Sequence, residues 1–168
     1  AIYVSSGTAY IAGGNYSNNF AQNGGGGAIS IYKSTVYISG GNFENNKARY
    51  GGGIAVCTAS SAASSCVMTG GTIGGNSRPN VVYSSLHPEQ ANGGAVYIEP
   101  DTTFSLGGSA YIPYGGSIKS NDVYLAKTVS GDTVKYATLN VTRSNTDLTG
   151  STTLVAVITP QEYKRGIP

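Results

Sequence analysis

The sequence is poor in charged residues, has no tryptophan, and contains one histidine and one methionine. Only 11% of its 168 residues are charged, and the formal net charge is +2. A typical globular domain has about 25% charged residues. Such sparse and unclustered charge excludes the basic groove of a nucleic-acid-binding protein and the polybasic segment of a membrane anchor. No stretch reaches the roughly 18 to 20 apolar residues of a membrane span, so none is expected.

Glycine and tyrosine are abundant instead. The chain has 25 glycines and 13 tyrosines, and 39% of its residues are hydrophobic, enough for one domain with a core. Glycine pairs separate short runs rich in β-branched residues, whereas helical bundles need long segments at helical spacing. The apolar content and low net charge also argue against intrinsic disorder. The sequence therefore predicts a single all-β domain.

A repeat runs through the first part of the chain. Residues 13–19 (GGNYSNN) and 40–46 (GGNFENN) lie 27 residues apart and agree at five of seven positions, and a degenerate copy (GGTIGGN) begins at residue 70. A second signature recurs as GAISI at residues 27–31 and GAVYI at 94–98. Similarity at a fixed period indicates a solenoid, and the alternation within each short run indicates strands.

These repeats predict a right-handed, single-stranded parallel β-helix with about 27 residues in each three-sided coil. Residues 1–116 are expected to form the coils. Beyond them the pattern loosens, and residues 117–168 are expected to form the final coils and a C-terminal cap that protects the open strands. Because the chain starts within a repeat signature (AIYV), we expect an N-terminally truncated fragment whose natural protein continues upstream.

One corner of each coil should carry an asparagine and an apolar residue. Asparagine tolerates a positive φ, and amides stacked along the axis can hydrogen-bond to one another. An aromatic or aliphatic side chain three residues earlier would plug the same corner. The predicted ladder residues are Asn19, Asn46 and Asn76, and the predicted plugs are Tyr16, Phe43 and Ile73.

Strand alternation directs several tyrosines outward. Tyr10 and Tyr37 occupy equivalent positions of successive coils, which are about 4.8 Å apart in a parallel sheet. They should form an aromatic ladder, joined by Tyr3 and Tyr97 on the neighbouring face. One hypothesis is that this strip binds a glycan or a protein. The other is that the rings stack only to stabilise the coils.

Cys57 and Cys66 bracket a segment of Thr, Ala and Ser. A disulfide between them would close a short loop, as an oxidising compartment permits, and we expect this bond. The alternative is a pair of thiols that pack as small hydrophobic groups.

Residues 26–29 (GGAI), 93–96 (GGAV) and 43–46 (FENN) resemble the GGA(I/L/V) and FxxN motifs of chlamydial polymorphic outer membrane proteins, and similar repeats of spirochaete surface proteins. The alternating motifs cover residues 1–98, with Tyr16 and Ile73 in place of the phenylalanine. The resemblance implies a bacterial outer-membrane, cell-surface or secreted protein. It also implies a structural or adhesive role, with a host surface protein or glycan as the partner.

Parallel β-helices also occur in polysaccharide lyases and glycosidases, so a polysaccharide-binding or polysaccharide-degrading fragment is the alternative function. Glycoside hydrolysis needs two facing carboxylates about 5 to 10 Å apart. None of the eight acidic residues recurs at coil spacing, and the close pair Glu99 and Asp101 flanks Pro100, which favours a solvated turn. A lone histidine, His87, supplies neither a triad nor a metal site. We therefore expect no enzyme activity, no cofactor and no bound metal.

An ice-binding solenoid is a further class that the sequence disfavours. It would carry a Thr-x-Thr array on one face of every coil, whereas the threonines of this chain look scattered or adjacent in the sequence. The glycine-rich nonapeptide of calcium-binding solenoids is absent too.

Overall fold

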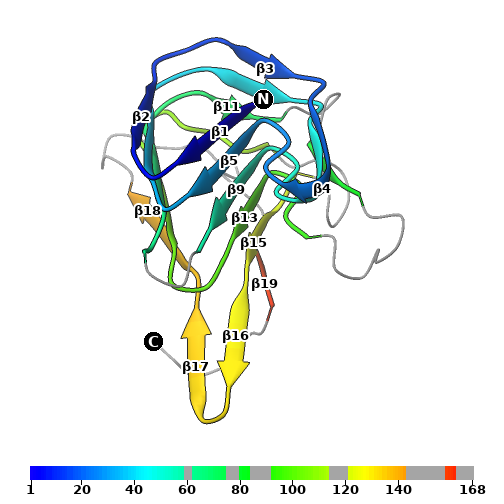
Figure 1. The fold of residues 1–168 in the computed structure, drawn as a ribbon. Coiled ribbons are helices and arrows are strands. Elements are labelled where there is room, and N and C mark those ends of the chain that lie inside the picture. The colour runs from blue at the N-terminus through cyan, green and yellow to red at the C-terminus, as the bar shows by residue number, and fades with distance from the viewer. Residues whose placement is uncertain (59–61, 75–79, 84–91, 114–120, 143–157, 162–168) are drawn as a thin grey trace, which may run out of the picture.

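The computed structural model describes residues 1–58, 62–74, 80–83, 92–113, 121–142 and 158–161. They contain strands and no helix, so no described segment is a helix that could cross a membrane. The strands wind into successive coils, and each strand pairs in parallel with the equivalent strand of the next coil (Figure 1). The predicted parallel β-helix is thus confirmed. Figure 1 also shows an antiparallel hairpin that extends away from the coils.

Two sheets form the longest walls of the β-helix. Sheet A consists of β1 (Ile2–Ser5), β5 (Ile29–Tyr32), β9 (Ile54–Cys57), β13 (Val96–Ile98), β15 (Val123–Leu125) and β19 (Ile158–Pro160). Sheet B consists of β2 (Thr8–Ile11), β6 (Thr35–Ile38), β10 (Ser65–Met68), β14 (Thr103–Gly107) and β18 (Thr138–Thr142).

Two shorter sheets close the first three coils. Sheet C consists of β3 (Asn15–Ser17), β7 (Asn42–Glu44) and β11 (Thr72–Ile73), and sheet D of β4 (Phe20–Gly25), β8 (Lys47–Tyr50) and β12 (Val81–Val82). These coils therefore have four strands each, and the expected three-sided coil is wrong. Sheet D was missed because its segments lack strict alternation, and the register between β4 and β8 shifts within the glycine-rich part of β4.

The 27-residue period holds between the first two coils, where Ile2 pairs with Ile29 and Tyr10 with Tyr37. Insertions lengthen later coils, so that Ile54 pairs with Val96. The predicted boundary at residue 116 lies outside the described residues. Beyond it, β15, β18 and β19 continue sheets A and B, and the antiparallel hairpin of β16 (Lys127–Ser130) and β17 (Thr133–Tyr136) interrupts the coil.

Alternate residues of the strands fill the interior. On β5, Ile29 and Ile31 are fully buried while Ser30 between them is not, as the two-residue period of a strand requires. Each such buried aliphatic or aromatic side chain stabilises the fold by about 1.5 to 3 kcal/mol. The same inward rows contain Val36, Ile38, Ile54, Val56, Met68, Val96, Ile98, Phe104 and Leu106.

The GGA signature has a backbone cause. Gly26 and Gly51 immediately precede the turn into β5 and β9, and both have positive φ. A Cβ on Gly26 would overlap the carbonyl of Ile29, and one on Gly51 would overlap that of Ile54. Only glycine therefore fits this turn without strain.

Candidate functional site

The asparagine corner is a continuous hydrogen-bonded ladder. The side-chain amide of Asn19 donates to Oδ1 of Asn46 over 2.9 Å, and Asn46 donates to Oδ1 of Asn80 over 3.0 Å. Asn80 donates in turn to Asn121 over 3.2 Å. The predicted ladder residue Asn76 lies outside the described residues, and Asn80 is the third member.

The ladder also satisfies the backbone at this corner. The amide of Asn46 donates to the Tyr16 carbonyl over 2.7 Å, and its Oδ1 accepts the backbone N–H of Asn19 over 3.0 Å. Asn121 was missed because it does not follow the 27-residue period, although Ile118 precedes it by three residues as Ile73 precedes Asn76. Its side-chain amide donates to the Ile73 carbonyl, as that of Asn80 donates to the Phe43 carbonyl.

The three predicted plugs lie together at the same corner. Tyr16 and Phe43 are stacked, with ring centroids 4.8 Å apart and planes 8° apart. Phe43 pairs with Ile73 in sheet C, and both are fully buried. This corner is structural, because its polar and apolar groups are used in holding successive coils together.

The expected disulfide does not form, and both cysteines are free thiols. Cys66 alternates with outward residues of β10 and is buried in the core, whereas Cys57 follows the inward Val56 and faces the outside of β9. The two thiols thus lie on opposite sides of the β-helix wall. Burial raises the pKa of both thiols, to about 12 for Cys57.

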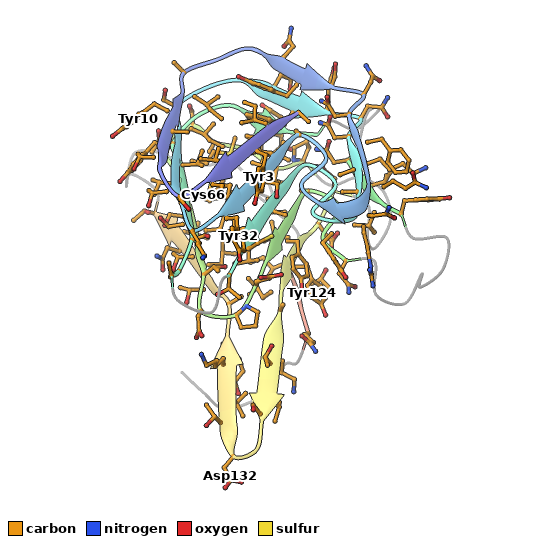
Figure 2. All side chains as sticks on the ribbon, in the orientation of Figure 1. Tyr3, Tyr10, Tyr32, Cys66, Tyr124 and Asp132 are labelled. Carbon is orange, nitrogen blue, oxygen red and sulfur yellow. The ribbon has the colours of Figure 1, made fainter. Side chains whose placement is uncertain are left out.

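The four tyrosines of the predicted ladder do not form one strip. Tyr10 and Tyr37 stack on the outside of sheet B, with centroids 5.2 Å apart and planes 11° apart. They are 78% and 41% exposed, and Figure 2 shows Tyr10 pointing away from the coils. Tyr97 lies on sheet A, where it stacks on Tyr124 with centroids 5.7 Å apart.

Tyr3 is also on sheet A but is not brought together with Tyr97. The row that contains both runs through Ser30 and Ala55, which have no rings. A Cβ on Gly25 would lie 2.8 Å from that of Ala55, so β4 covers the outside of sheet A there. The exposed ring of Tyr3 is therefore isolated from the rings around Tyr97.

The outer face of sheet B is uncharged. Its five strands bring together a row of hydroxyl-bearing residues, and within this row Ser65 donates to Thr35 over 3.1 Å. A second row, two residues further along, includes the tyrosine stack. We name these ten residues the sheet B face: Thr8, Thr35, Ser65, Thr103 and Thr138 in the first row, and Tyr10, Tyr37, Val67, Ser105 and Asn140 in the second.

The threonines of the first row are aligned in the structure, although they look scattered in the sequence. They look scattered because the insertions between them have unequal lengths. Strand pairing nevertheless places a threonine or serine at the same position of all five strands. The adjacent row holds tyrosine, valine, serine and asparagine, so the face is no regular Thr-x-Thr array.

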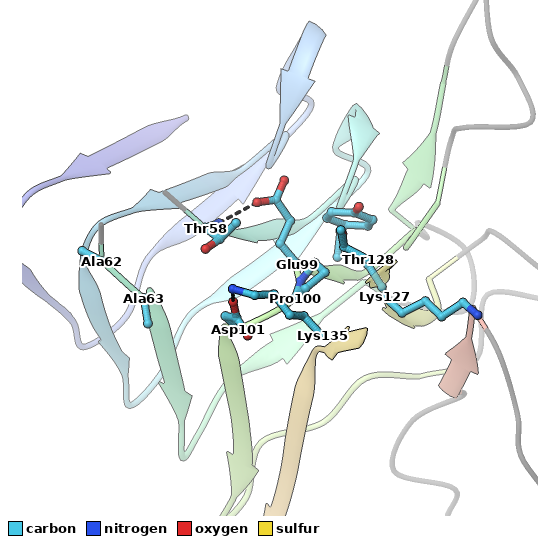
Figure 3. A pocket seen from close by; sticks show the side chains of 11 residues that line it. Thr58, Ala62, Ala63, Glu99, Pro100, Asp101, Lys127, Thr128 and Lys135 are labelled. Carbon is cyan, nitrogen blue, oxygen red and sulfur yellow. Dashed lines mark hydrogen bonds and ion pairs between the residues drawn. The ribbon is translucent and has the colours of Figure 1, made fainter. Parts of the chain in front are cut away.

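A pocket of about 560 Å³ lies at the corner where sheet A passes into sheet B (Figure 3). Part of the lining comes from Thr58, Ala62 and Ala63 between β9 and β10, part from the hairpin, and part from the end of β13. The lining residues are Thr58, Ala62, Ala63, Tyr97, Glu99, Pro100, Asp101, Ala126, Lys127, Thr128 and Lys135.

The two acidic residues of this corner differ in burial and in their partners. Glu99 is half-buried, and its Oε2 accepts the backbone N–H of Thr58 over 2.6 Å. Burial raises the pKa of Glu99, and the hydrogen bond from Thr58 partly opposes this. Asp101 is more exposed and forms an ion pair with Lys135 of the hairpin. The sequence interpretation of a solvated turn therefore suits Asp101 but misses the enclosure of Glu99.

Comparison with protein-family models, curated proteins and solved structures gives no match. Of the features that the resemblance implies, the structure shows the general one, which is a β-solenoid built from repeated, stacked parallel strands. His87 lies outside the described residues. Among the residues that are described, no three His, Cys, Asp or Glu side chains gather as metal ligands would.

Proposed function

We propose that the protein is a bacterial cell-surface or secreted β-helix with a structural and adhesive role, and that its sheet B face binds an uncharged glycan of a host or matrix. The observation that carries this proposal is the composition of the face. Ten outward positions on five successive strands hold hydroxyls, two stacked tyrosines, a valine and an asparagine, without one charge.

A glycan complements these groups chemically. Hydroxyl side chains both donate and accept hydrogen bonds, as sugar hydroxyls do. The exposed rings of Tyr10 and Tyr37 offer an apolar surface with a polar tip, which suits the mixed faces of a sugar ring. Because the face has no charge, binding an uncharged polymer does not require removing water from an ion.

The repeat of the face suits an extended polymer. Equivalent side chains recur at each strand, about 4.8 Å apart along the β-helix axis. A shallow hollow of about 130 Å³ beside the tyrosine stack adds contact surface, lined among others by Ala12, Ser39 and Thr69. Many weak contacts along one chain sum to a useful affinity.

The bacterial surface location is supported by the motifs. The GGAI, GGAV and FENN segments are the basis for relating this chain to polymorphic outer membrane proteins. The positive φ of Gly26 and the burial of Phe43 give these motifs a structural reason in this β-helix.

We propose binding without turnover. In the pocket, Asp101 is engaged by Lys135, whereas glycoside hydrolysis requires two carboxylates acting together. The rival is a glycan-degrading enzyme in which half-buried Glu99 acts as the general acid. Hydrolysis and lyase assays on neutral and acidic polysaccharides separate the two functions, because sustained turnover would establish the rival.

The face itself is tested with a double variant, Tyr10→Ser and Tyr37→Ser. We expect it to lose binding on a glycan array and on insoluble neutral polysaccharides. The matched control is Tyr136→Ser, which removes an exposed tyrosine from the hairpin. Unchanged binding by the double variant, with a lowered melting temperature, would mean that the rings only stabilise the coils. Binding to proteins alone would also overturn the glycan proposal.

A further inference from the structure

We propose that the pocket between β13 and the hairpin is a second binding site, which takes about one or two uncharged sugar units. The site is separate from the sheet B face. It shares the ligand class of the proposed function, but it rests on different residues and is tested by a different measurement.

The pocket exists because the chain is lengthened twice at one corner. In the first two coils, residues 6–7 and 33–34 suffice to join sheet A to sheet B. In the third coil the connection between β9 and β10 is longer, and after β15 the whole hairpin is inserted. Insertions at one corner of a solenoid project from the same side and commonly carry its binding residues. Here Thr58, Ala62 and Ala63 of the first insertion and three residues of the hairpin line the pocket around the end of β13.

The hairpin wall is held in place by contacts with the coil. Lys135 of β17 forms its ion pair with Asp101, and the backbone N–H of Asp101 donates to the Tyr136 carbonyl over 3.1 Å. At the base of the hairpin, Ala137 donates to the carbonyl of Ala126 over 3.0 Å. The pocket is therefore formed before a ligand arrives, which lowers the entropic cost of binding.

Glu99 supplies a hydrogen-bond acceptor inside the pocket. Its Oε2 is oriented by the backbone of Thr58 (Figure 3), and among the described residues no lysine or arginine pairs with its carboxylate. Lys135 is engaged by Asp101, and the Lys127 side chain points away from Glu99. A half-buried carboxylate in this position favours a ligand that donates hydrogen bonds and disfavours an anionic one. The two lysines of the lining, Lys127 and Lys135, disfavour a cationic ligand.

The remaining lining matches the body of a sugar. The ring of Tyr97 forms part of the wall and is held by stacking on Tyr124. Alanine and proline side chains add apolar surface, and Thr58 and Thr128 add hydroxyl groups. A pyranose likewise presents C–H groups on its faces and hydroxyls at its edge. The volume falls within the range of about 300 to 1,000 Å³ that is usual for small-molecule sites.

The test is a titration of the full chain with soluble sugars, followed by two-dimensional amide NMR. The probes are glucose, galactose and N-acetylglucosamine as uncharged sugars, glucuronate as the anionic one, and glucosamine as the cationic one. We expect millimolar binding of at least one uncharged sugar, with shifts concentrated at Thr58, Tyr97 and Thr128, and no binding of glucuronate.

Two variants assign the site. Glu99→Gln keeps an acceptor for Thr58 but removes the charge, and we expect it to weaken binding roughly fivefold or more. Thr128→Trp places a large side chain from the exposed hairpin over the pocket and should abolish binding without touching the core. The matched control is Asp132→Asn, a charge removal at the hairpin tip shown in Figure 2, which should leave the affinity unchanged.

Several results would overturn this inference. They are the absence of shifts with every uncharged sugar, preferential binding of glucuronate or glucosamine, and equal affinities of Glu99→Gln, Thr128→Trp and the unsubstituted chain. The double variant of Tyr10 and Tyr37 keeps the pocket intact, so its titration should match that of the unsubstituted chain. Failure of the sheet B face and failure of the pocket are thereby distinguished.

Discussion

The side-chain amide of Asn46 donates to Oδ1 of Asn80 over 3.0 Å, and both residues are fully buried. This bond and the other hydrogen bonds of the asparagine ladder satisfy the buried polar groups of this corner. Each inner asparagine contacts the coils before and after it. The ladder therefore couples neighbouring coils, and its inner members should matter most.

Replacing Asn46 with Ala should lower the free energy of unfolding by about 2 to 4 kcal/mol, because it leaves several buried backbone and side-chain groups without partners. Urea unfolding followed by circular dichroism measures this loss. Asn140→Ala, on an exposed position of β18, is the control and should cost less than about 0.5 kcal/mol. Equal effects of the two substitutions would contradict a structural role for the ladder.

Gly51→Ala should destabilise the protein by more than about 1 kcal/mol. Gly51 has a φ of 57°, and an added Cβ would overlap the Ile54 carbonyl, so the backbone of this turn must shift. Gly7→Ala is the matched control, because nothing lies within 4 Å of its added Cβ and its φ is not positive. Thermal unfolding of both variants checks the difference, and a melting temperature unchanged by Gly51→Ala would refute the argument.

Both cysteines should be found reduced, and both should react slowly in the folded protein. Since the thiolate is the reactive form, raising the pKa of Cys57 to about 12 should slow its alkylation at pH 9 by roughly a hundredfold to a thousandfold relative to an exposed cysteine. Iodoacetamide labelling with mass spectrometry measures this rate. After unfolding without a reductant, both thiols should be labelled. Recovery of a single unlabelled species, lighter by two hydrogens than the reduced chain, would instead show that Cys57 and Cys66 form a disulfide.

Glu99 should make stability depend on pH. Burial raises its pKa in the folded state above the ordinary value of 4.5, so the folded protein binds the proton more tightly than the unfolded chain. The resulting stabilisation is complete below the unfolded pKa and is lost as pH rises through the folded pKa. The melting temperature of Glu99→Gln, relative to the unsubstituted chain, should therefore rise between pH 4 and 7. A difference independent of pH would show that the pKa of Glu99 is the same in the folded and unfolded states, and would contradict the effect of burial.

Much of the β-helix could be predicted because its repeats record local requirements. The alternation of Ile29, Ser30 and Ile31 already distinguishes inward-facing from outward-facing side chains. The separation of Tyr10 and Tyr37 by one repeat period predicts that their strands are neighbours. The fourth strand of the first three coils was not predicted, because β4 and β8 lack such alternation. The predicted disulfide was wrong because closeness in the sequence does not determine on which side of the β-helix wall the side chains of Cys57 and Cys66 lie.

The sequence by itself determined the solenoid, its inward rows and the glycine-rich turns, since each of these depends on a few neighbouring residues repeated at one period. Only the tertiary structure decided which residues meet across insertions of unequal length. Strand pairing made Asn80 and Asn121 members of the ladder and aligned the hydroxyls of the sheet B face. It also placed the hairpin opposite Glu99, because hydrogen bonds between coils depend on register and not on distance along the chain.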